Sequence, residues 1–187
     1  MVSITRKILF SIAILIFSVL SLEIGVRAVF FIKHIFKPQQ EQFSKDIGWK
    51  NKENFSTEYV LKNFGSQKIH YSTHEHGFRI FGDVKTKKTK IFVLGDSFTD
   101  AHTVSDGREY YAYLKSLDDR VEVFAYGCGG YGSLQEYMIL DKYFDLIKPD
   151  IVLWQFYSND YINNSYPLES RCPEHNNHMR RPYLENG

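Results

Sequence analysis

Residues 90–97 read KIFVLGDS, and the assignment of the fold begins with this stretch. Four apolar residues follow Lys90, and Gly95 ends the run. A short apolar run bounded by glycine is typical of a strand that is buried on both faces of a parallel sheet. The stretch therefore predicts a buried strand that ends at Gly95, with Asp96 and Ser97 in the turn that follows.

The order of strand, turn and helix repeats along the rest of the chain. Apolar runs at residues 121–125 and 151–156 predict two further buried strands. Apolar positions at helical spacing predict one helix over residues 107–117 and another from 133 to about 147. Strands that alternate with helices predict a parallel sheet joined by right-handed crossovers.

Helix starts are suggested by the spacing of a capping box, in which a hydroxyl or carboxylate residue is followed three residues later by an acid. Asp106 with Glu109 has this spacing before the first helix, and Ser133 with Glu136 has it before the second. The segment 97–100 fits the same pattern, so Ser97 could serve as a plain helix cap.

Chemistry-bearing residues follow each predicted strand: Ser97, the glycine-rich turn around Gly130, and Asn159. In open α/β sheets, ligands bind beyond the carboxyl ends of the strands. A hydroxyl that is surrounded by backbone N–H groups and a carboxamide supplies what acyl transfer needs, namely a nucleophile and an oxyanion hole. Each residue also has an ordinary structural use, as a helix cap or in a turn. Their occurrence together at three successive strand ends favours a functional role over these structural ones.

The same three segments resemble the SGNH hydrolases, the GDSL-like lipases and esterases. Residues 91–100 (IFVLGDSFTD) are similar to their first block, which makes Ser97 the implied nucleophile. Residues 125–135 (AYGCGGYGSLQ) are similar to the second block, with Gly130 as the oxyanion glycine. Residues 156–164 (FYSNDYINN) are similar to the third, with Asn159 as the oxyanion asparagine. The Ser97 backbone N–H would complete the hole.

This resemblance covers about residues 78–183 and implies a flavodoxin-like, three-layer α/β/α fold. Such proteins hydrolyse, or sometimes transfer, ester-linked acyl groups, and some bacterial members carry an N-terminal membrane helix and act on acylated envelope polysaccharides. The chain departs from the family because it contains no Asp-x-x-His block and shows three strands where about five are expected. We therefore expect an incomplete, C-terminally truncated domain. His102, His175 and His178 are the possible replacements for the missing base.

The first 32 residues hold nearly all the unbroken apolar sequence. Residues 8–32 are long enough for a membrane-spanning helix, on which Glu23 and Arg27 could pair at i and i+4. An uncleaved anchor is the favoured interpretation, with the domain outside the cytoplasm. A signal peptide with a weak cleavage site at residues 19–21 and a buried core helix are the alternatives.

The polar segment between this helix and the sheet predicts a linker with short strands at residues 59–61 and 68–72. Its cluster of lysines could contact phosphates, but a solvated loop is the preferred interpretation; the lysines are Lys85, Lys87, Lys88 and Lys90. His74 with His76, and Cys172 with its two following histidines, offer too few ligands for a structural zinc. Cys128 is expected to be a buried thiol rather than a nucleophile.

The sequence thus predicts a membrane anchor at residues 1–37, a linker with leading strands at 38–89 and a partial SGNH-type domain at 90–187. A net charge of +1 gives no sign of nucleic-acid binding, and two cysteines allow one disulfide at most. The favoured function is a membrane-anchored serine esterase that acts on O-acyl esters, with envelope polysaccharide as a candidate substrate and without a metal or cofactor. The alternatives are an inactive domain that binds acylated glycan and an O-acyltransferase that uses the same residues.

Overall fold

The computed structural model describes residues 4–35, 40–62, 65–172 and 180–184. The chain divides into two compact units, Met1–Gln39 and Gln40–Gly187. The first unit contains α1 (Ile4–Ile35). Its segment Leu9–Val29 has a mean hydropathy of 2.4 and is long and apolar enough to cross a membrane, a property that an N-terminal signal sequence shares.

The expected ion pair forms on this helix. The guanidinium of Arg27 lies 2.7 Å from the carboxylate of Glu23, one turn earlier. Pairing at this spacing offsets part of the cost of placing both charges within an apolar segment.

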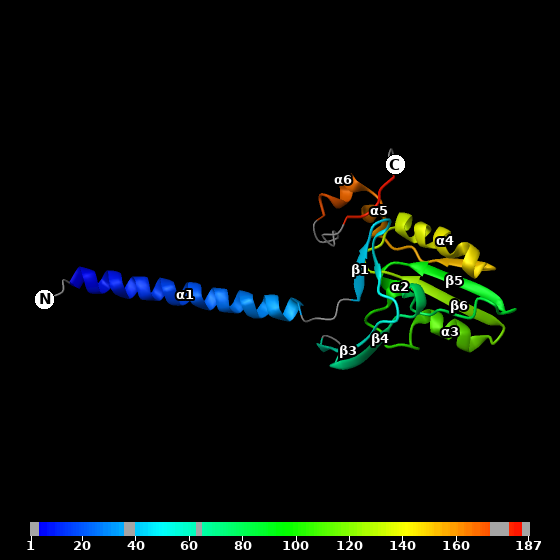
Figure 1. Cartoon of the computed structure of the whole chain (residues 1–187), viewed down its shortest axis with the longest axis horizontal. Coiled ribbons are helices and arrows are strands. Elements are labelled where there is room, and N and C mark those ends of the chain that lie inside the picture. Colours follow the sequence, from blue (N-terminus) through cyan, green and yellow to red (C-terminus); the bar gives the residue numbers. More distant parts are fainter. Residues whose placement is uncertain (1–3, 36–39, 63–64, 173–179, 185–187) are drawn as a thin grey trace. The chain divides into compact units, whose positions relative to one another are not determined.

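The second unit is built on a parallel sheet of three strands in the order β6-β5-β7 (Figure 1). The strands are β5 (Thr89–Gly95), β6 (Val121–Gly127) and β7 (Ile151–Trp154). The sequence prediction of a mixed α/β domain with parallel strands is therefore confirmed. The third strand ends two residues earlier than expected.

Each face of this sheet packs against a different helix (Figure 1). On one face, the side chains of Phe92 and Phe124 join a core cluster with α4 (Ser133–Ile147). On the other face, neighbouring residues such as Val93 form a second cluster with α3 (Tyr110–Leu117). This alternation arises because successive side chains of a strand point to opposite faces.

The prediction that the third strand is buried is wrong. Ile151, Leu153 and Trp154 remain 45%, 40% and 42% exposed. In the described residues β7 pairs with β5 alone, so it forms an edge of the sheet. An apolar run indicates a strand buried on both faces only where helices cover both faces of the sheet at that strand. Here α3 packs mainly on β6 and α4 on β5, so β7 is left partly uncovered.

Two antiparallel hairpins precede the sheet. β3 (Ser56–Leu61) pairs with β4 (Gln67–Ser72), which confirms the short strands predicted there. β1 (Glu41–Ser44) pairs with β2 (Gly48–Asn51), a hairpin that the sequence did not predict. Because Trp49 of β2 is fully buried in the core, the segment assigned as a linker packs within the compact unit.

Short helices complete the unit and lie near the carboxyl ends of the strands. They are α2 (Ser97–Asp100), α5 (Asp160–Asn163) and α6 (Tyr166–Glu169), with a 3₁₀ turn, η2 (Glu75–Gly77), after the second hairpin.

The predicted capping boxes are wrong in detail. α3 begins at Tyr110 after Glu109, without a side-chain cap. Asp106 is unavailable as a cap because its carboxylate accepts hydrogen bonds from Ser72 and Arg79. α4 begins after Gly132, whose backbone N–H donates to the Gln135 side chain at 3.3 Å.

Candidate active site

The carboxyl ends of the three strands lie level with one another. Gly95 of β5 is in register with Gly127 of β6, and Leu94 is in register with Trp154 of β7. The loops that leave these strands therefore start side by side at one edge of the sheet, as the sequence predicted.

Ser97 is the first residue of α2, directly after the turn that leaves β5. The N-cap is Asp96, whose carboxylate accepts from the Phe98 backbone N–H at 3.0 Å, so the interpretation of Ser97 as a plain cap is wrong. The Ser97 side chain is half-buried, and its hydroxyl has no hydrogen-bond partner among the described residues.

The turn at residues 96–100, which follows β5, and the glycine-rich loop are in very close contact. A Cβ at Gly127 would lie 2.1 Å from the Asp100 backbone nitrogen and 2.8 Å from the Asp96 carbonyl oxygen. Since these are backbone atoms, only glycine allows α2 to approach the end of β6 so closely. Gly130 has a φ of 74°, in the left-handed region, so it also serves the turn.

The turn at residues 96–100 also contacts the loop that follows β7. Thr99 Oγ1 donates to Gln155 Oε1 at 3.1 Å, and a Cβ at Gly95 would lie within 2.4 Å of both atoms. The rings of Phe98 and Tyr157 pack with centroids 4.4 Å apart. These contacts hold the first and third segments together.

A third set of contacts joins the glycine-rich loop to α5. The Leu134 backbone N–H donates to Asn164 Oδ1 at 3.2 Å, and a Cβ at Gly132 would lie 2.7 Å from the same oxygen. Each of the three segments singled out from the sequence therefore contacts the other two.

Asn159 precedes α5 but makes no side-chain cap. Its carboxamide nitrogen lies 2.9 Å from the carboxamide oxygen of Asn163. The Asn159 side chain therefore lies against the Asn163 carboxamide.

A buried polar network of Asn163, Glu169 and Arg181 lies next to Asn159. The sequence did not predict it. Asn163 contacts Glu169 at 3.4 Å, and the Arg181 guanidinium pairs with the Glu169 carboxylate at 2.7 Å. Arg181 also lies 4.9 Å from the ring of Trp49. The network connects α5, α6 and the β1–β2 hairpin, and it restricts how Asn159 is presented.

The β1–β2 hairpin holds the glycine-rich loop by three hydrogen bonds. Trp49 Nε1 donates to the Gly129 carbonyl at 2.9 Å, and the Tyr131 hydroxyl donates to the Trp49 carbonyl at 2.6 Å. Asn51 Nδ2 donates to the Gly127 carbonyl at 2.7 Å. Only the glycine signal of this loop was visible in the sequence.

Arg79 lies buried beneath α2 and fixes its carboxyl end. Its Nε donates to the Asp100 carbonyl at 2.8 Å, and its guanidinium pairs with Glu109 at 2.8 Å and with Asp106 at 2.9 Å. The Asp100 carboxylate accepts from the Tyr71 hydroxyl at 2.7 Å, and its burial raises its pKa.

Glu41 and His102 are titratable groups near Asp100. Burial, together with the charge of Asp100, raises the pKa of Glu41 to about 7. His102 Nδ1 lies 3.8 Å from the Asp100 carboxylate, and its side chain is 48% exposed. The other candidate bases, His175 and His178, lie outside the described residues.

The two cysteines are free and differ in exposure. Cys128 is fully buried, and its burial raises the pKa of the thiol, as expected for a structural cysteine. Across the described residues, no group of three or more His, Cys, Asp or Glu side chains could hold a metal ion.

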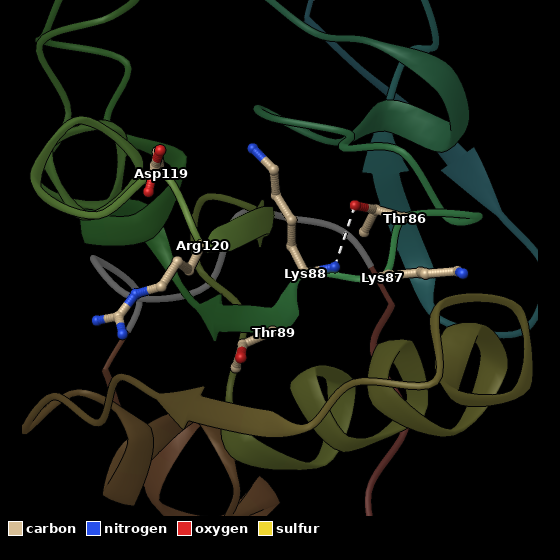
Figure 2. Close-up of a pocket in the computed structure, with 6 residues that line it drawn as sticks. All are labelled: Thr86, Lys87, Lys88, Thr89, Asp119 and Arg120. Atoms are coloured by element: carbon tan, nitrogen blue, oxygen red, sulfur yellow. Dashed lines mark hydrogen bonds between the residues drawn. The ribbon is translucent and has the colours of Figure 1, made fainter.

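An open hollow beside the amino ends of β5 and β6 is lined by two of the clustered lysines, Lys87 and Lys88 (Figure 2). Lys87 and Lys88 are exposed and extend in different directions, and Arg120 is paired with Asp118 at 2.7 Å. Lys90 instead donates to two backbone carbonyls, of Val84 and Ile147. The exposed lysines fit the interpretation as a solvated loop, and Lys90 is structural.

Comparisons with known proteins add no assignment, because no protein-family model and no curated protein matches the chain.

Proposed function

We propose that this chain is a membrane-anchored serine hydrolase of the SGNH type that cleaves O-acyl esters outside the cytoplasm. Ser97 is the nucleophile, and the backbone N–H groups of Ser97 and Gly130 together with the carboxamide of Asn159 form the oxyanion hole. A flavodoxin-like fold for the domain and attachment through α1 belong to the same proposal.

The observation that carries the proposal is the state of Ser97. Its hydroxyl is half-buried and lacks a hydrogen-bond partner among the described residues, although α2 is fixed by Asp96 and Arg79. It lies where three strand ends meet, each followed by backbone donors or a carboxamide. An accessible hydroxyl without a protein partner is free to approach a substrate carbonyl.

The proposed chemistry has two steps. The Ser97 oxygen attacks the ester carbonyl carbon as its proton passes to a base, and the carbonyl oxygen becomes an oxyanion held by the three donors. The leaving alcohol takes a proton as the C–O bond breaks, and water then releases the acid from the acyl-serine. His102, five residues after Ser97 and 3.8 Å from the Asp100 carboxylate, is the described histidine that we propose to test as the base.

A fluorophosphonate probe tests the nucleophile directly in the full chain in detergent. We expect the wild type to be labelled and Ser97→Ala to remain unlabelled. Ser158→Ala, which removes an exposed hydroxyl at the same edge of the sheet, is the matched control and should label normally. Labelling that survives Ser97→Ala, or its absence from the wild type, would overturn the proposal.

Turnover of p-nitrophenyl acetate separates the hydrolase from a domain that only binds esters. Removing an oxyanion-hole donor typically costs about 10²–10³ in kcat. We therefore expect Asn159→Ala to lose about that factor while its circular dichroism remains that of the wild type. A wild type that binds but never cleaves the ester would be a binding module instead.

A further inference from the structure

Three buried carboxyl groups accompany the three segments of the candidate site. Asp96 immediately precedes Ser97, Asp160 immediately follows Asn159, and Glu136 lies in the first turn of the helix that follows the glycine-rich loop. All three are at most 1% exposed. The sequence pattern placed Glu136 in a capping box and indicated no role for Asp96 or Asp160.

Each carboxyl group has one bonded oxygen and one oxygen without a partner. Asp96 accepts from the Phe98 N–H at 3.0 Å, Asp160 accepts from the Tyr157 N–H at 2.9 Å, and Glu136 accepts from Trp154 Nε1. The other oxygen of each group is buried and has no hydrogen-bond partner in the part of the chain that the structure describes. Such oxygens are costly when they carry charge.

The three groups also act on one another electrostatically. Burial first, and then the charges of Asp160 and Asp96, raise the pKa of Glu136 to about 8. Burial and the charge of Asp96 raise the pKa of Asp160 to about 6, although Arg181 opposes this shift.

The groups that face Glu136 come from every element packed around it. They are Asp96 before α2, Asp160 of α5, the Trp154 indole of β7 and the Tyr110 hydroxyl of α3. Neither of the last two carries a positive charge, and Arg181 acts on Asp160. The groups that face Glu136 therefore offer its ionised form one hydrogen bond, from Trp154, and no positive charge.

We propose that Glu136 holds a proton in the active state and thereby limits the negative charge beside the oxyanion hole. This inference rests on the proposed function. The oxyanion of the reaction adds a negative charge at Ser97, and a third buried carboxylate nearby would oppose it in a medium where charges are weakly screened. Glu136 acts through the hole and is a positioning residue, whose ionisation lowers activity.

The pH dependence of p-nitrophenyl acetate turnover by the full chain in detergent tests this role. Once Glu136 ionises, the active fraction should fall about tenfold for each pH unit. Glu136→Gln, which keeps the shape but carries no charge, should retain activity at the high pH where the wild type has lost it. Asp141→Asn, an exposed change on the same helix, should keep the wild-type profile. An unchanged alkaline fall in Glu136→Gln would overturn the proposal.

A second measurement does not depend on turnover. Because the Trp154 indole donates to Glu136, tryptophan fluorescence should titrate with Glu136 in the wild type. The transition should vanish in Glu136→Gln and in Trp154→Phe, and it should persist in Asp141→Asn. Titration without hydrolysis would support Glu136 as the proton holder and count against the esterase. Absence of the titration in the wild type would overturn the role of Glu136 whatever the activity.

Discussion

Replacing Arg79 by methionine tests whether the buried polar network beneath α2 holds the domain together. The guanidinium is buried, contacts the Tyr71 ring at 4.0 Å, and pairs with the equally buried carboxylate of Glu109. It also reaches the Asp100 carbonyl. One side chain therefore connects the second hairpin, α2 and the start of α3.

The expected loss is large because Arg79→Met leaves Glu109 buried without its partner. Breaking a buried ion pair from one side typically costs about 3–5 kcal/mol. The total free energy of unfolding of a domain is about 5–15 kcal/mol, so the variant should lose a substantial share of its stability. Adding Glu109→Leu removes the unpaired charge, and the double variant should recover part of this loss.

Urea unfolding of the full chain in detergent, followed by tryptophan fluorescence, measures the effect. Arg120→Met is the matched control, because its pair with Asp118 is on the surface and the Arg120 side chain is 84% exposed. Surface pairs contribute about 0–1 kcal/mol. If Arg79→Met cost no more than Arg120→Met, the network would not be a major source of stability.

Three further predictions concern the surroundings of the site. Gly127→Ala should lower the free energy of unfolding in urea by about 1–3 kcal/mol, because the added Cβ meets the backbone of α2. Gly129→Ala should cost less, since its Cβ would lie 3.2 Å from a flexible side chain; equal losses would contradict the argument. Glu41 has a raised pKa of about 7, so the folded state binds its proton more tightly than the unfolded state does. The wild type should therefore lose stability relative to Glu41→Gln as the pH rises from about 4.5 to 7, with a constant difference above that range. A urea series across this range checks it, and parallel stability curves would refute it. Finally, iodoacetamide should modify half-buried Cys172 in the native chain and fully buried Cys128 only after unfolding, as peptide mass spectrometry would show. Equal rates of alkylation in the native chain would contradict that burial.

Local sequence patterns were sufficient for the sheet and its helices. The run that contains Phe92 and the helical spacing from Ser133 to Ile147 depend on neighbours in sequence, and both elements formed where expected. The glycines and polar residues at the strand ends were also placed at one edge, because parallel strands leave few alternatives. The exposure of β7 was missed, because burial depends on what covers a strand and not on the strand itself.

The rest of the site depends on partners that are far away in sequence. Trp49 bonds to Gly129, 80 residues later, and Arg181 contacts Gln135, 46 residues earlier. A charged residue such as Arg79 is normally predicted to be exposed, and its burial becomes favourable only when its partners have assembled around it. No local pattern carries that information. The residues that hold the site in place could therefore not be predicted from the sequence, whereas its proposed chemical groups could.

The residues that hold the site in place differ from Ser97 in their contacts, and this difference is relevant to the proposed function. Arg79, Trp49 and Arg181 are held by several partners, so their contacts are explained by folding. Ser97 is different, because its hydroxyl bonds to no described residue while its backbone is fixed between the Asp96 cap and the buried end of α2. Places where a sequence departs from what stability requires are expected to be functional. For Ser97 this expectation is the proposed nucleophilic role, which the fluorophosphonate labelling of the wild type and of Ser97→Ala tests.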